Sequence, residues 1–107
     1  MTISDQYRTA AKAWAEADGK ARELEAKKEP TLWRMAKARI DEAATRSVTL
    51  TITAAEREVK ASPEWEAFAV NEVAHARTEA NKLRGEMDSL MIKHEEAIGA
   101  VSRGRAA

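Results

Sequence analysis

The sequence contains no cysteine, and its 107 residues include only two prolines, four glycines and 5% aromatic residues. Without cysteine the chain has no disulfide bond, no cysteine-ligated zinc and no thiol nucleophile. It has no apolar run near the roughly 20 residues that span a bilayer, and its start, MTISDQYRTA, lacks the basic and apolar segments of a signal peptide. We therefore expect a cytoplasmic protein that makes no contact with a membrane.

Large apolar side chains are also scarce. Apolar residues make up 44% of the chain, but 23 of them are alanine. Full burial of one Val, Leu, Ile, Phe or Met contributes only about 1.5–3 kcal/mol, so the remaining side chains build a thin core. A lone compact globule is not expected, and self-association is one way to gain the missing stability.

The residues that dominate the composition, Ala, Glu, Lys, Leu and Arg, are typical of long helices and coiled coils. We expect an all-α fold, a long helical hairpin or coiled coil with a short connecting helix, which self-associates into an oligomer. One domain is predicted over residues 1–98, followed by a flexible basic tail at 99–107. Its expected helices are 4–29, 31–46, 53–60 and 63–98, with an extended connector at 47–52.

Local signals set these boundaries. Pro30 predicts a kink or short break, because it lacks a backbone donor and disfavours helical geometry at the preceding residue. Residues 48–52 alternate between apolar side chains and threonine, which indicates either an extended connector or a strand edge awaiting another subunit. Thr53 has the spacing of a capping box with Glu56, although Thr51 is a competing cap. Ser62 before a proline at the first helical position is the strongest helix start in the chain.

The last predicted helix carries a heptad seam. Two of its positions are alanine, a residue that permits close helix approach but buries little area. A histidine within such a seam can fix register or oligomer state. The seam residues are Val73, Ala76, Ala80, Leu83, Met87, Leu90 and His94.

Few residues have the spacing of a metal-binding or catalytic site. Glu72 and His75 have the E-x-x-H spacing of di-iron helical bundles, but such a site needs a second motif, and His94 has no glutamate three residues before it. We therefore expect His75 to face the solvent and not to bind a metal. The sequence has no Ser-His-Asp order and no glycine-rich phosphate loop. We expect a non-catalytic protein with no metal and no cofactor.

The charge cancels to zero over the chain but is unevenly distributed. Residues 31–62 carry six basic and four acidic groups, whereas residues 63–98 carry four and eight. Basic groups with an aromatic ring among them are what single-strand binding requires, because cations follow phosphates and bases stack on rings. An ordinary solvated helix face with Trp33 in the core is the alternative. The candidate DNA-binding residues are Lys27, Lys28, Trp33, Arg34, Lys37 and Arg39.

The order of several short motifs resembles the UvsY-type recombination mediators of tailed phages, over residues 20–98. The motifs are Glu25-Ala26-Lys27-Lys28, Ala36-Lys37-Ala38-Arg39-Ile40-Asp41, Val59-Lys60-Ala61-Ser62 and Lys93-His94. A wider set of small phage proteins shares the pattern of Thr51, Val59, Pro63 and Trp65. Pro30 within the long helix and an alanine-rich last helix depart from the family pattern.

This resemblance implies a helical oligomer, with a ring as one form, that binds single-stranded DNA in the infected bacterial cell. Its implied partners are a RecA-like recombinase, which it loads onto the strand, and the single-strand-binding protein that it helps to displace. Lys37 and Arg39 match the family's DNA-binding run, and Lys27 and Lys28 match the lysines that precede it. Trp33 and Arg34 come from local chemistry alone.

A second hypothesis is a small coiled-coil adaptor or inhibitor of phage origin that binds another protein. Its acidic residues 63–98 would then face a basic partner. Salt-sensitive binding to bare single strands is expected only of the first hypothesis. Only the second predicts that charge reversal at Glu64, Glu66 or Glu72 has a larger effect than loss of Lys37.

Overall fold

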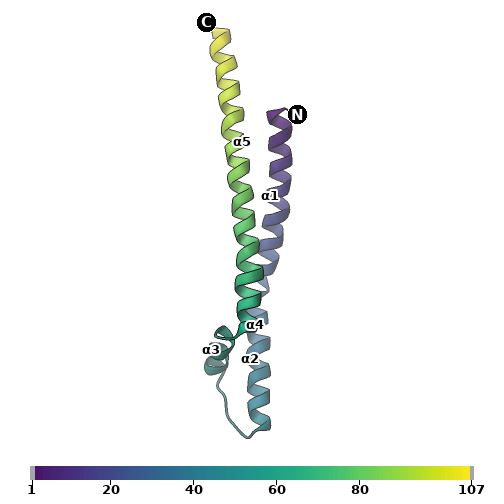
Figure 1. Cartoon of the computed structure of the whole chain (residues 1–107), viewed down its shortest axis with the longest axis vertical. Helices are drawn as coiled ribbons and strands as arrows, with labels where there is room; N and C mark the ends of the chain where they lie inside the picture. Colours follow the sequence, from purple (N-terminus) through teal and green to yellow (C-terminus); the bar gives the residue numbers. More distant parts are fainter. Residues whose placement is uncertain (1, 107) are drawn as a thin grey trace.

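Two long helices lie side by side over most of the molecule (Figure 1). The computed structural model describes residues 2–106, with side chains up to residue 99. The molecule is a rod that measures 84 × 20 × 17 Å. Its elements in chain order are α1 (Ile3–Ala26), α2 (Lys28–Thr45), α3 (Ile52–Lys60), α4 (Pro63–Glu66), the π-helix η1 (Ala67–Ala74) and α5 (His75–Ala106).

The rod has two parts. In the body, α1 runs against η1 and α5, so that the two chain ends lie at the same end of the rod and α5 extends beyond α1 (Figure 1). In the head, residues 27–62, α2 continues the direction of α1 and α3 folds back against α2 (Figure 1). All regular structure in residues 2–106 is helical, and the predicted all-α hairpin is confirmed.

The break between the first two helices lies at Lys27, three residues before its predicted position at Pro30. The first helix was expected to reach residue 29, but α1 ends at Ala26. Pro30 cannot donate to the Ala26 carbonyl and its ring crowds that oxygen, so the disruption falls one turn before the proline. The Lys27 N–H donates to the Leu24 carbonyl at 3.1 Å, and the Lys27 carbonyl accepts from the Thr31 N–H at 3.0 Å. Pro30 therefore lies in the first turn of α2, where a missing donor is tolerated.

α2 ends in a Schellman motif. The N–H groups of Ser47 and Val48 donate to the carbonyls of Ala44 and Ala43 at 3.1 and 2.9 Å. This geometry needs a left-handed residue, and Ser47 supplies it with a φ of 58°. Residues 48–50 then have no regular structure, so the alternating run acts as a connector within this chain.

α3 begins one residue earlier than predicted, because Thr51 rather than Thr53 caps it. The Thr51 hydroxyl accepts a hydrogen bond from the Ala54 N–H at 3.2 Å. Thr53 lies inside the first turn of α3 instead, so it does not form a capping box with Glu56.

Ser62 joins α3 to the long helical column that follows. Its hydroxyl accepts from the Trp65 N–H at 3.3 Å and donates to the Val59 carbonyl at 2.6 Å. One buried side chain therefore closes α3 and opens α4 at Pro63, where the sequence predicts a helix start.

The column differs from the expected helix in two respects. Residues 67–74 form a π-helix, a wider geometry that the apolar spacing did not predict. The backbone then stays helical to Ala106, whereas the sequence predicted an end near residue 98. The last residues contain no proline and only isolated glycines, so nothing stops the helix. For the predicted basic tail, the side chains of residues 100–107 lie outside the described residues.

The head has the larger core. Ala36 of α2 packs with Ala55 and Val59 of α3, and all three side chains are buried. Partly buried apolar residues surround them: Leu32, Met35, Ile40, Leu50 and Trp65.

The body is held by a seam of small residues. Ala21 of α1 and Ala80 of α5 are fully covered, and Val73 of η1 is nearly so. The other predicted seam residues are half-buried: Ala76, Leu83, Met87, Leu90 and His94. Because η1 and α5 run along α1, this seam is used inside one chain, and self-association would need another surface.

Candidate nucleic-acid interface

Pro30 lies where two shallow grooves of the head meet. One, the α3 groove, is lined by Glu29, Pro30, Leu32, Trp33, Glu56 and Lys60. The other, the η1 groove, is lined by Leu24, Lys27, Pro30, Thr31, Arg34, Met35, Phe68 and Glu72. Trp33 and Arg34 are consecutive in α2 but line different grooves. We call the place where these grooves meet, at Pro30, the Pro30 corner.

Trp33 is the aromatic residue that lines the α3 groove. Its side chain is 57% exposed, so the alternative of a core tryptophan is wrong. The Lys37 Nζ atom, one helical turn later, lies 5.4 Å from the ring centroid. Lys60 reaches the same groove from α3. The groove therefore holds the exposed Trp33 ring and Lys60 together with Glu29 and Glu56, and Lys37 lies over the ring beside it.

Lys27 and Arg34 lie together in the η1 groove, beside the half-buried ring of Phe68. The Lys27 Nζ atom is 3.6 Å from a carboxylate oxygen of Glu23, in an exposed pair of the kind that contributes little to stability. Glu72 lines the same groove and lowers its positive potential. The sequence did not single out Phe68, because its neighbours along the chain carry no positive charge.

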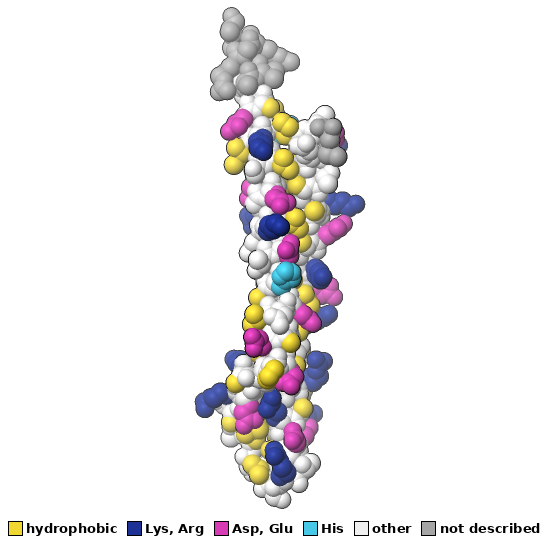
Figure 2. Space-filling model, in the orientation of Figure 1, with side chains coloured by type: hydrophobic (Ala, Val, Ile, Leu, Met, Phe, Trp, Pro, Cys, Tyr) yellow, Lys and Arg dark blue, Asp and Glu magenta, His cyan; other side chains and the backbone are white. Residues whose placement is uncertain are grey.

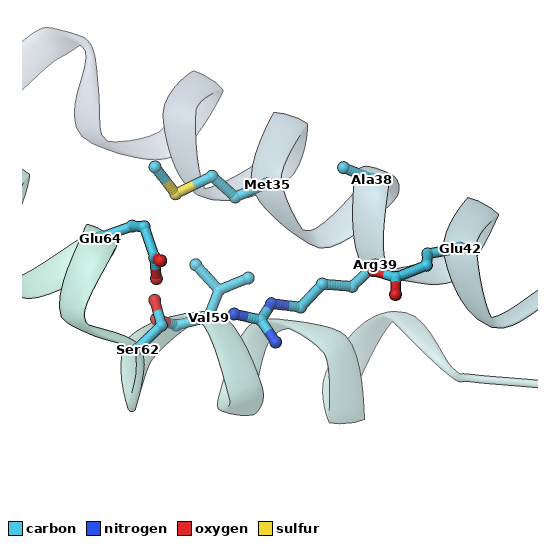
Figure 3. A pocket seen from close by; sticks show the side chains of 7 residues that line it. All are labelled: Met35, Ala38, Arg39, Glu42, Val59, Ser62 and Glu64. Carbon is cyan, nitrogen blue, oxygen red and sulfur yellow. The ribbon is translucent and has the colours of Figure 1, made fainter.

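Lys28 and Arg39 lie elsewhere. Lys28 lines a separate cleft with Glu25, Val73 and Arg77, and therefore faces the body. Arg39 lies in a groove between α2 and α3 (Figure 3). Its Nη1 atom is 3.7 Å from a carboxylate oxygen of Glu58. The six candidate residues thus do not form one continuous patch: four of them gather around the Pro30 corner, and these two do not.

The groove around Arg39 is mixed in charge. Figure 3 shows the Arg39 side chain running between the two helices, with the Glu42 carboxylate beside it on α2. Glu64 and Ser62 line the other end of the groove, where Met35 of α2 and Val59 of α3 are its larger apolar side chains. Arg39 and Glu58 form an exposed pair between α2 and α3, which, like that of Lys27 with Glu23, contributes little to stability.

A charged cluster in the body was not predicted from the sequence. Arg77 donates from Nε and Nη2 to the two carboxylate oxygens of Glu25, at 3.1 and 2.6 Å, and from Nη1 to Asp18 at 2.7 Å. Arg22 also contacts Asp18, at 2.9 Å. The cluster joins α1 to α5 and fixes how the helices align along the seam.

Hydrogen bonds from Arg77 lower the pKa of the Asp18 and Glu25 carboxyl groups, while partial burial opposes the shift. The same hydrogen bonds raise the pKa of the Arg77 guanidinium. The three charges therefore stay ionised together at neutral pH and hold one another in place. Such a closed network serves the fold and leaves little charge for a ligand.

The E-x-x-H residues lie on the body. Glu72, His75 and Glu79 line a groove between α1 and α5 with Lys20, and His75 is exposed. In the described part of the chain, no group of three or more His, Asp or Glu side chains is arranged to hold a metal ion. His94 is half-buried farther along the seam.

Comparison with known proteins gives no family: no family model, no curated protein and no solved structure matches the chain. The resemblance to UvsY-type mediators therefore rests on the short motifs alone. Over the described residues, no helix has the length and apolarity to cross a membrane.

Proposed function

We propose that the protein binds single-stranded DNA, without catalysis, at the Pro30 corner of its head. The observation that carries this proposal is the exposed Trp33 ring with the Lys37 ammonium 5.4 Å from its centroid. An exposed ring offers a stacking face to any unpaired base, and a nearby cation attracts the adjoining phosphate. A base inside a duplex has no free face, so this chemistry favours single strands.

The distribution of charge supports the head as the binding end. Residues 27–62 carry eight basic and five acidic side chains. Residues 2–26 and 63–99, which form the body, carry eight basic and thirteen acidic ones. A polyanion is therefore drawn to the head and repelled by the body.

The path around the corner uses four residues in two roles. Trp33 stacks a base in the α3 groove, with Lys37 beside it. Lys27 and Arg34 continue the contact with phosphates in the η1 groove. Lys28 and Arg39, the other two candidates, are left out of this path because each lines a groove other than these two.

Acidic side chains in both grooves, Glu29 and Glu56 in one and Glu72 in the other, keep the affinity of one copy low. Self-association overcomes this limit, because several weak sites on one strand give an avidity well above that of a single site. An oligomer that covers a strand in this way fits the wider role of a phage recombination mediator. Support for passing the strand to a RecA-like recombinase, in place of single-strand-binding protein, comes from the motif resemblance.

Fluorescence anisotropy of a labelled oligothymidylate, titrated at about 50 and 200 mM salt, tests the proposal. We expect binding that weakens steeply with salt. Lys37→Ala should lower the slope of log affinity against log salt by roughly one unit, as loss of one phosphate contact does. Lys82→Ala is the matched control, since Lys82 is an exposed lysine on the body.

No binding at the lower salt concentration, or equal losses in the two variants, would refute the proposed site. The adaptor hypothesis would then be preferred, because the acidic residues of the long column, among them Glu64, Glu66 and Glu72, are exposed.

A further inference from the structure

The π-helix η1 changes which side chains of the long column face the rest of the protein. In an α-helix, two residues five positions apart point about 140° away from each other, because each residue turns the chain by about 100°. The hydrogen bonds of a π-helix join residues five apart, so such residues lie nearly above one another. Phe68 and Val73 of η1 have this separation; Val73 is buried and Phe68 is half-buried. An unbroken α-helix would turn Phe68 away from the side on which Val73 lies.

Turned in this way, the Phe68 ring lines the η1 groove together with Lys27 and Arg34. The volume of this groove, about 540 Å³, lies within the range of roughly 300–1,000 Å³ for sites that hold small organic molecules. Short π segments inside α-helices also occur frequently at functional sites. The wide turn therefore places an aromatic ring where two cations already lie.

The Phe68 ring is supported by the head. Its centroid lies 5.8 Å from that of Trp65, and the two ring planes are tilted by 55°. Trp65 in turn packs against the buried cluster of Ala36, Ala55 and Val59. A ring that is already held in place loses little conformational freedom when a ligand packs on it, which favours binding.

Charge alone gives the η1 groove little attraction for a polyanion. Figure 2 shows basic and acidic side chains interspersed over the head. Within the groove, Glu72 opposes Lys27 and Arg34, and Lys27 also pairs with Glu23. Stacking of a base on an aromatic ring needs no net charge. It is therefore the interaction through which this groove can hold a strand in spite of its carboxylates.

We infer that Phe68 is a second base-stacking residue, placed in the η1 groove by the π-helix. A single strand at the Pro30 corner then stacks one base on Trp33 and another on Phe68, with Lys27 and Arg34 at the phosphates beside the second base. Because Pro30 lines both grooves, the two rings belong to one continuous path. This inference rests on the proposed DNA binding and adds a second contact to it.

Anisotropy with labelled oligothymidylate, on the full chain, measures the contribution of the ring. Phe68→Leu should lower the affinity about fivefold or more, as loss of one stacked base does. The slope of log affinity against log salt should not change, because no phosphate contact is lost. Phe68→Tyr keeps a ring and should bind nearly as well as the wild type. Trp14→Leu is the matched control, since Trp14 is a half-buried aromatic residue of the body, beside Arg84, and should leave the affinity unchanged.

Intrinsic fluorescence tests the contact itself. A protein with Phe68→Trp and with Trp14, Trp33 and Trp65 each changed to Phe has its single indole at position 68. Unlabelled oligothymidylate should quench this emission. The matched protein, which keeps only Trp14, should show no quenching.

The outcomes separate this inference from the proposed function. If the wild-type protein does not bind the strand, both fail. If it binds and Phe68→Leu binds equally well, or the indole at position 68 is not quenched at saturating DNA, this inference alone is wrong. A loss of affinity that Phe68→Tyr fails to restore, with helicity by circular dichroism retained, would also contradict stacking on this ring.

Discussion

The head and the body both bury alanines, but different side chains surround those alanines. In the head, Val59 and larger, partly buried side chains pack around the buried Ala36 and Ala55, and Trp65 of α4 closes this hydrophobic cluster from the body. In the body, fully covered alanines bring two helices close together, and Arg77 supplies the specific contacts. A small-residue seam gains little from burial and depends on close fit, whereas the head depends on area. The two halves should therefore respond differently to the same kind of substitution.

Loss of volume should damage the head most. Val59→Ala removes two methyl groups from a fully buried site and should cost about 2–3 kcal/mol of unfolding free energy, from lost transfer energy and the remaining cavity. Urea unfolding followed by circular dichroism measures the change. A loss no larger than that of an exposed Val48→Ala control would contradict the proposed core.

Gain of volume should damage the body. Ala80→Leu places a large side chain where two helices touch, and overpacking of this kind costs about 1–3 kcal/mol. Ala74 is exposed, so Ala74→Leu is a control that we expect to be near neutral. An equally small effect of Ala80→Leu would mean that the helices lie farther apart than the structure has them.

Low pH should weaken the body before the head. The pKa values of Asp18 and Glu25 are lowered in the folded chain from their usual 3.8 and 4.5. Their contribution is therefore complete above the unfolded values and is lost as pH falls through the lower, folded values. Arg77→Met should lower the melting temperature by several degrees at pH 7 and flatten its fall toward pH 3. A wild-type protein whose melting temperature does not change between pH 6 and pH 3 would contradict this role.

The smallest effect is expected at the C-cap of α2. Ser47 holds a left-handed backbone at a cost that glycine avoids, so Ser47→Gly should raise the unfolding free energy by about 0.5–1 kcal/mol. Ser47→Val, whose branched side chain suits this geometry least, should lower it. If both substitutions changed stability in the same direction, the cap geometry would be wrong.

The helices of both halves could be predicted from the sequence, but the contacts between them could not. Ser62 before Pro63 is a purely local start signal, and the structure has a helix start there. Pro30 marked a break, although the hydrogen bond that it removes lies one turn earlier. The Arg77 cluster could not be predicted, because Asp18 and Glu25 are more than fifty positions away from Arg77 along the chain. Their meeting depends on how α1 and α5 align, which an alanine-rich seam does not fix.

The candidate site could likewise be predicted only in part. Basic residues around Trp33 are visible in the sequence, but a helix distributes them over several faces. The structure leaves Trp33 and Lys37 open, turns Lys28 toward the body and pairs Arg39 with Glu58. Residues from other segments, Lys60 and Phe68, complete the two grooves.

The central claim is that a base stacks on Trp33, and intrinsic fluorescence tests it most directly. In a protein carrying Trp14→Phe and Trp65→Phe, Trp33 is the single indole. Titration with unlabelled oligothymidylate should quench its emission strongly, with a midpoint that matches the anisotropy titration and rises with salt. Unchanged emission at saturating DNA would show that Trp33 does not contact the strand.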